Sequence, residues 1–193
     1  MPEEQLKSRI DYFRASKKYD DLNSAVSAGD KSAVESFLFA GKEADKSRDG
    51  GDFNTPLHVA AYKKDFEMFE LLYKSLPRER RLKTINTPNK NGVTPLLEAS
   101  LMPEFVDDKM LENMPKLMKY IVSHGGDCNA KGFINGQVEY RGKIQYCNAL
   151  ETLNLQLDEY DKNSKEFAVL QKCVSQVNFA MSLEQNRTSI EKE

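Results

Sequence analysis

The chain has 193 residues, of which 39% are hydrophobic and 30% are charged, and its formal net charge at pH 7 is −2. This length fits one domain or one short repeat array, and the composition excludes a largely disordered protein. The small net charge gives no overall attraction to nucleic acid or to an anionic lipid surface.

The sequence predicts neither a membrane segment nor a secreted protein. No run approaches the roughly 18 apolar residues that a spanning helix needs, and the first residues lack the basic and apolar regions of a secretory signal. Cys128, Cys147 and Cys173 are odd in number and far apart, which favours neither a disulfide framework nor a paired-cysteine zinc site. We therefore expect a cytoplasmic protein in a reducing compartment, with no cofactor and no metal.

The first predicted element is an amphipathic helix over residues 2–15. Leu6, Ile10 and Phe13 recur there at helical spacing among charged residues. We expect this helix to cap the first repeat through that apolar face.

A pair of short helices follows the cap. In the first, Asp20 or Asp21 can cap the start and Gly29 ends the helix. In the second, Val34 and Phe37 lie on the face that would meet the same core. The pattern predicts a tight helical hairpin.

The segment Thr55-Pro56-Leu57-His58-Val59-Ala60-Ala61 has a partial copy at Thr94-Pro95-Leu96. Proline suits the first helical position, because its missing N–H costs nothing there and its fixed φ favours the helix. After the first copy, Phe69, Leu72 and Tyr73 repeat the spacing of Val34, Phe37 and Leu38, so one buried pattern occurs twice. We expect the scaffold to depend on Thr55, Pro56, Leu57, His58, Ala60, Ala61, Thr94, Pro95 and Leu96.

These segments resemble the ankyrin repeat, whose pattern they match piecewise. The lead-in Asn89-Lys90-Asn91-Gly92-Val93 precedes the second copy, and Gly125-Gly126-Asp127-Cys128-Asn129 matches the family's Gly-Ala-Asp-x-Asn ending. The resemblance implies a mostly all-α fold: an ankyrin-repeat solenoid of about four helix pairs with an N-terminal capping helix and β-hairpin turns, one of them extended as a finger. It also implies that His58 is structural and hydrogen-bonds neighbouring turns.

We predict a single ankyrin-repeat domain over 1–193. The third repeat carries inserts, and the fourth is degenerate, because Asn148-Ala149-Leu150 keeps only the leucine of the motif. The predicted cap, four repeats and polar tail occupy 1–19, 20–52, 53–91, 92–145, 146–185 and 186–193.

Unequal repeat spacing locates three insertions. About six added residues fall around the basic run 77–83, which we interpret as a solvated loop, with a role in binding phosphate or an acidic partner as the alternative. About ten more follow Ser100, where Pro103 and Pro115 should break helices and where Met102, Phe105 and Val106 are apolar. This loop either folds back on its own repeat or joins a contact site, and both interpretations stay open.

The third insertion, of about eleven residues, lies in the turn region after Asn129. Asn135-Gly136 lies there between β-prone residues and is a strong hairpin signal. We expect a β-hairpin that projects as a finger.

No catalytic or metal-binding constellation is predicted. His58 and His124 are interpreted as structural, and nothing near Cys128 or Cys147 in the sequence would activate either thiol to pair with His124. Cys173 falls beside an apolar face and is interpreted as a packing residue.

The predicted function is that of a non-catalytic module that binds another protein through its concave face and the finger. The alternatives are a substrate clamp or regulatory part of an enzyme system, and a nucleic-acid binder, which would need a longer basic stripe. The irregular insertions are similar to those of divergent ankyrin proteins that intracellular bacteria deliver into host cells. The candidate partner-binding residues are Phe53, Tyr62, Lys63, Lys90, Leu101, Met102, Phe105, Phe133, Ile134, Tyr140 and Arg141.

Overall fold

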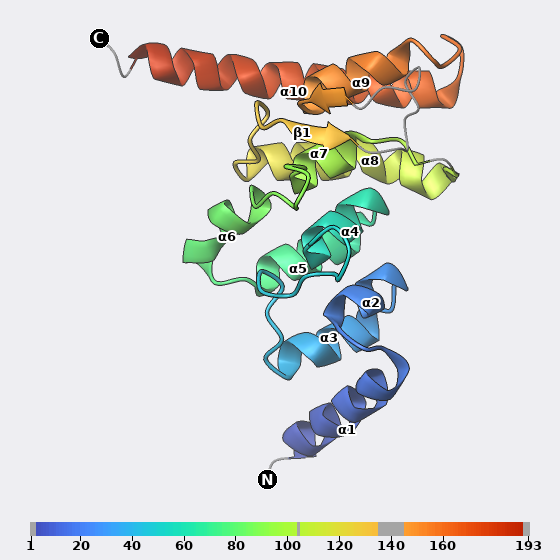
Figure 1. The fold of residues 1–193 in the computed structure, drawn as a ribbon, viewed down its shortest axis with the longest axis vertical. Helices are drawn as coiled ribbons and strands as arrows, with labels where there is room; N and C mark the ends of the chain where they lie inside the picture. Colours follow the sequence, from blue (N-terminus) through green and yellow to red (C-terminus); the bar gives the residue numbers. More distant parts are fainter. Residues whose placement is uncertain (1–2, 104, 135–144, 191–193) are drawn as a thin grey trace.

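In the computed structural model, the chain forms an elongated stack of helix pairs with the two termini at opposite ends (Figure 1). The structure describes residues 3–103, 105–134 and 145–190. The pairs are α2 (Leu22–Ser27) with α3 (Lys31–Phe39), α4 (Pro56–Tyr62) with α5 (Phe66–Ser75), α7 (Pro95–Ser100) with α8 (Asp108–Ser123), and α9 (Ala149–Leu157) with α10 (Lys165–Ile190). The expected mostly helical solenoid of about four helix pairs is confirmed.

Short polar side chains fix where the helices begin. The Thr55 hydroxyl accepts the His58 N–H at the start of α4, and Thr94 and Asn148 act in the same way on α7 and α9. An N-cap of this kind contributes about 1 kcal/mol. In the first three pairs the second helix begins on an aspartate, as at Asp65 before α5. The helix starts therefore follow from local chemistry that the sequence displays.

A large apolar core runs through the stack. Ala60, Ala61 and Ala99 are fully buried, so that α4 and α7 can pack closely. Phe69 and Leu72 of α5 are fully buried beneath them. Because each pair has too little apolar surface to form its own core, the pairs are stable only when stacked.

Helix α1 (Glu3–Lys18) covers the N-terminal end of the stack, but not through the predicted face. Ile10 and Phe13 are exposed, so that expectation was wrong. Instead the Tyr12 ring meets Phe37 edge-on, with 5.6 Å between the ring centroids, and Ala15 is buried. The edge of the Phe37 ring at the open end of α3 accommodates an aromatic ring, and this contact selects the face of α1 that docks.

The basic run after α5 is a helix, α6 (Arg78–Ile85), and not the predicted loop. Its Arg80 guanidinium donates to Asp45 and to Glu43, each over 2.7 Å. Thr84 and Ile85 at its end are buried. Contacts with residues about 35 positions away hold this helix, which the local sequence could not reveal.

One part of the insertion after Ser100 is buried against the stack and another part is exposed, so each of the two open interpretations holds for part of it. Met102 is buried, and its N–H donates to the Gln156 Oε1 over 2.6 Å, whereas Phe105 is 84% exposed. Pro115 was predicted to break a helix, but it lies inside α8, which continues on both sides of it. Proline is tolerated there at the loss of one main-chain donor.

Strands β1 (Gly132–Ile134) and β2 (Gln145–Cys147) form the expected antiparallel hairpin. Ile134 pairs with Gln145, so residues 135–144 lie between the two strands in the sequence. Asn135-Gly136 and the rest of 135–144 lie outside the described residues. At the end of the chain, α10 continues to Ile190, so the predicted tail does not begin at residue 186.

The base of the hairpin packs against the preceding turn, and this contact yields a prediction. A Cβ at position 132 would lie 2.7 Å from the backbone carbon of Gly92 and 2.7 Å from the nitrogen of Val93. Since backbone cannot move aside easily, Gly132→Ala should lower the free energy of unfolding by about 1–3 kcal/mol. Urea denaturation would measure the loss.

Gly51→Ala is the matched control, because nothing lies within 4 Å of a Cβ there. It should change stability by less than about 0.5 kcal/mol. Equal stabilities of the two variants would show that the hairpin base is not held against the turn.

Candidate functional site

The turns between repeats join into one wall. The Lys90 N–H donates to the Asp52 carbonyl over 3.0 Å, and the Phe133 N–H donates to the Asn91 carbonyl over 2.8 Å. The Asn89 side-chain amide donates to Asn54 Oδ1 over 2.9 Å. Each turn is thus tied to the next, and β1 continues the row.

His58 ties α4 to the turn of the next repeat. Its Nδ1 accepts the Thr55 N–H over 3.2 Å and lies 2.8 Å from the Thr55 hydroxyl, so Nδ1 carries no proton. Its Nε2–H therefore donates to the Val93 carbonyl over 2.9 Å. The side chain is buried. The structural role that the family resemblance implied for His58 matches this geometry.

Burial lowers the pKa of His58 from 6.5 to about 4, despite the hydrogen bond to Val93. The geometry supplies a second reason for the same direction. A proton on Nδ1 would face the Thr55 N–H, which is itself a donor. The neutral imidazole is therefore part of the folded state.

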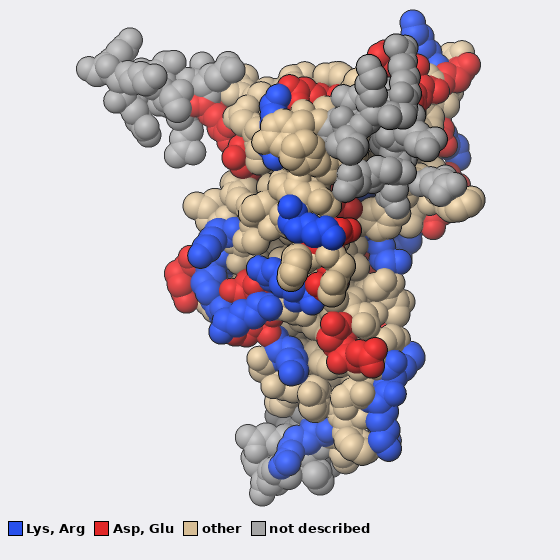
Figure 2. All heavy atoms as spheres, in the orientation of Figure 1, with Lys and Arg blue, Asp and Glu red and all other residues tan. Residues whose placement is uncertain are grey.

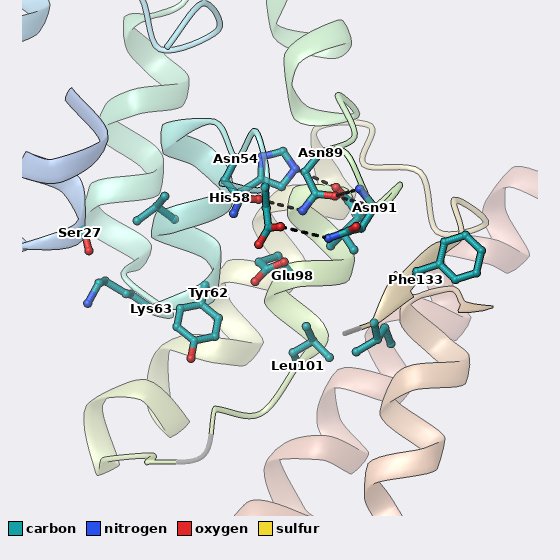
Figure 3. A pocket seen from close by; sticks show the side chains of 14 residues that line it. Ser27, Asn54, His58, Tyr62, Lys63, Asn89, Asn91, Glu98, Leu101 and Phe133 are labelled. Carbon is teal, nitrogen blue, oxygen red and sulfur yellow. Dashed lines mark hydrogen bonds between the residues drawn. The ribbon is translucent and has the colours of Figure 1, made fainter. Parts of the chain in front are cut away.

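A pocket of about 350 Å³ opens on the concave side of the stack. Its walls come from the turns, from α4 and α7, and from the base of the hairpin, and Figure 3 shows Glu98 between the asparagine network of the turns and the Tyr62 ring. The lining residues that come from the turns and helices are Ser27, Asp52, Asn54, His58, Val59, Tyr62, Lys63, Asn89, Asn91, Val93, Glu98 and Leu101, and the hairpin adds Phe133 and Ile134.

Glu98 is the acidic group at the centre of this pocket. Its carboxylate makes no hydrogen bond or ion pair with a described residue, although its main-chain carbonyl does. Burial raises the pKa of Glu98 to about 7, against the opposing effect of Lys64. Asp52 and Asp49 raise this pKa further.

Lys64 is a buried lysine with a left-handed backbone, φ 53°. Its Nζ donates to the carbonyls of Glu98, over 2.9 Å, and Ala61, over 3.3 Å, which belong to the last turns of α7 and α4. A cation at two helix C-termini is favourable, but burial still lowers the pKa of Lys64 from its ordinary 10.5. Lys64 therefore joins the two inner helices beneath the pocket.

The pocket brings together five of the predicted partner-binding residues. Phe133 is exposed, Tyr62 and Lys63 are half-buried, and Leu101 and Ile134 are buried. Leu101 and Ile134 pack with Val93, Leu97 and Cys147 and also line the pocket, so they form part of its floor.

The other predicted residues lie elsewhere. Met102 is buried in the apolar core, so its side chain is not exposed to a partner. Phe53 and Phe105 are exposed, and Lys90 is paired with Asp52 over 2.9 Å. Tyr140 and Arg141 lie outside the described residues.

Sequence reasoning missed Glu98, although the repeat register could have found it. Glu98 follows Thr94 by four positions, as Val59 follows Thr55, and Leu101 corresponds to Tyr62 in the same way. All four side chains line the pocket. Positions four and seven after the threonine therefore mark the concave surface.

The thiols are poorly suited to nucleophilic chemistry. Burial raises the pKa of Cys128 and of Cys173 to about 12, and the pKa of Cys147 is also raised, so all three remain protonated. Among the described residues, no three His, Cys, Asp or Glu side chains are arranged to hold a metal ion. Within the same ranges, no helix has the length and apolar character needed to cross a bilayer.

Basic side chains do not form a long stripe on the face drawn in Figure 2. Lys and Arg gather over α6, but Asp and Glu lie among them (Figure 2). Arg80 is used in two ion pairs, and Arg81 donates to the carbonyls of Leu76 and Lys74. These guanidinium groups therefore stabilise α6 and its contacts with neighbouring segments.

A family model for ankyrin repeats matches three copies over residues 22–132, which is more than half of the chain. The chain belongs to the ankyrin-repeat family. Ankyrin repeats are generally protein-interaction modules and are typically non-catalytic. The fourth helix pair, α9 with α10, lies beyond the matched residues, in keeping with the degenerate motif at Asn148.

A curated relative is similar to part of the chain. Transient receptor potential cation channel subfamily A member 1 of Drosophila melanogaster is 32% identical over 109 residues. The match covers 56% of this chain and 8% of that protein. The expected similarity to ankyrin proteins delivered by bacteria stays a prediction.

The buried neutral imidazole predicts a pH-dependent stability. Between pH 6.5 and about 4, the unfolded chain binds a proton at His58 that the folded chain does not. The contribution of His58 is therefore complete above pH 6.5 and is lost as the pH falls toward 4. At pH 4.5 the loss should be about 2–3 kcal/mol.

Urea denaturation of the protein and of His58→Asn at pH 7.5 and pH 4.5 would isolate this contribution, because other titrating groups are common to both. The gap in stability between the two proteins should narrow at the lower pH. A gap that does not change with pH, or a His58 NMR signal that titrates near pH 6.5 in the folded protein, would contradict the neutral buried imidazole.

Proposed function

We propose that this chain binds another protein on its concave surface, at the pocket formed by α4, α7, the turns and the base of the hairpin. The observation that carries the proposal is the exposure of large aromatic side chains along this row of turns. Phe53 is 55% exposed and Phe133 is 51% exposed. Phe133 also lines the pocket and stacks at a tilt on Tyr146, with 4.7 Å between the ring centroids.

The backbone at Phe53 supports the same proposal. Its φ is 58°, in a region that bulky residues rarely adopt, and its side chain is left in water. Strain of this kind is concentrated at binding and active sites. A strained and exposed aromatic ring at a turn would contribute to affinity when a partner covers it.

Rigidity supports a binding role as well. The hydrogen bonds from turn to turn and from His58 to Val93 hold the pocket walls in place. A preformed surface loses little conformational entropy when it binds. Tyr140 and Arg141, which were proposed as contacts from the sequence, lie outside the described residues.

The test is affinity capture with the whole chain, followed by measurement of the affinity for the captured protein. Tyr62→Ser and Phe133→Ser should each weaken that affinity about tenfold or more, because aromatic residues near an interface centre contribute about 1.4 kcal/mol or more. Thermal unfolding would show that both variants stay folded.

Phe39→Ser is the matched control, since Phe39 is an exposed aromatic residue on α3 that does not line the pocket. It should leave the affinity unchanged. A partner that binds both pocket variants as tightly as the parent protein would overturn the assignment of the concave surface.

A further inference from the structure

The pocket holds a carboxylate, that of Glu98, that lacks a partner among the described residues. Glu98 is half-buried beside apolar and aromatic side chains, and its carboxylate makes no hydrogen bond or ion pair with a described residue. Placing a charge away from water without a partner is unfavourable, and the pKa of Glu98 is accordingly raised to about 7. A cation bound here would remove that cost.

Among the described residues, no lysine ammonium group makes an ion pair or a hydrogen bond with the Glu98 carboxylate. The Lys64 ammonium donates to main-chain carbonyls, including that of Glu98, and no described ion pair joins the two side chains. The Lys63 side chain points away from Glu98 in Figure 3. Asp49 and Asp52 add negative charge nearby, and the carboxylate of Asp52 is already paired with Lys90.

We propose that the pocket receives an arginine side chain of the partner protein, with its guanidinium paired to the Glu98 carboxylate. This inference rests on the proposed protein-binding function and names the chemistry of the partner. The pocket volume of about 350 Å³ lies at the small end of ligand pockets, and so suits one side chain better than a large cofactor.

The surroundings favour a guanidinium over an ammonium. A guanidinium is planar, less strongly hydrated and able to bond a carboxylate through two parallel N–H donors. It also stacks on aromatic rings, and Tyr62 and Phe133 are aromatic residues of the pocket lining. Leu101 and Ile134 supply apolar surface for the methylene stem.

The test is an NMR titration of the whole chain with N-acetyl-arginine amide, and separately with its uncharged isostere N-acetyl-citrulline amide and with N-acetyl-lysine amide. Arginine amide should bind saturably and shift the signals of Glu98, Tyr62 and Leu101. Its affinity should be at least tenfold higher than that of citrulline amide or of lysine amide. If citrulline amide or lysine amide bound as tightly as arginine amide, the arginine assignment would be overturned. This comparison needs no substituted variant.

Glu98→Gln should weaken arginine amide at least tenfold. It should stay folded, because it removes an unfavourable charge. The matched control is Glu67→Gln, which alters an exposed carboxylate on α5 and should leave the binding unchanged. Arginine amide that binds Glu98→Gln as tightly as the parent protein would overturn the role of Glu98.

The two proposals fail separately. A captured partner that loses affinity for Tyr62→Ser and Phe133→Ser, yet binds Glu98→Gln with full affinity, would leave the concave surface in place and overturn the arginine pocket. The opposite outcome is also possible. If the captured partner bound Tyr62→Ser and Phe133→Ser with full affinity, while the protein still bound arginine amide through Glu98, only the proposed function would be overturned.

Discussion

The hydrogen bonds of a neutral His58 set the spacing between the central repeats, and the pocket depends on that spacing. The imidazole accepts from Thr55 within its own helix and donates to Val93 in the next turn. The turns are in turn tied to one another by main-chain hydrogen bonds. If the imidazole were protonated or absent, the turn walls would lose their fixed position relative to α4 and α7.

In the third repeat, apolar packing takes the place of the histidine hydrogen bonds. Leu97 stands where the motif has histidine, and it packs with Val93, Leu101, Ile134 and Cys147. The hairpin is therefore attached to the stack by a small apolar cluster and by the close approach of Gly132 to Gly92. This attachment brings Phe133 to the edge of the pocket, so that the hairpin and the inner helices contribute to one surface.

Much of the fold could be predicted from the sequence, because its determinants are local. The Thr55-Pro56 start of α4, the glycines at 29 and 41 and the capping aspartates each act within a few residues of themselves. The parts that could not be predicted depend on distant partners. Helix α6 is held by Arg80 with Glu43 and Asp45, and the docking face of α1 is selected by Phe37.

The candidate site was predicted in part for the same reason. Tyr62, Lys63 and Phe133 were proposed because aromatic and basic residues near ankyrin turns suggest contacts, and all three line the pocket. Glu98 was missed because Asp49 and Asp52, which help to raise its pKa, lie in a turn more than 40 residues earlier, and because Lys64 donates to its main-chain carbonyl and not to its carboxylate. For Met102 the sequence left burial and contact both open, because its hydrogen bond to Gln156 of α9 cannot be inferred from the apolar run alone.

The central claim is that a protein partner covers the concave surface. Hydrogen-exchange mass spectrometry of the chain, free and bound to a captured partner, would test it most directly. The account predicts slower exchange in peptides that span 50–63 and 88–102, with little change in α6 and in the outer helices α3 and α5. Protection confined to α6 or to α10, with none along the turns, would contradict it.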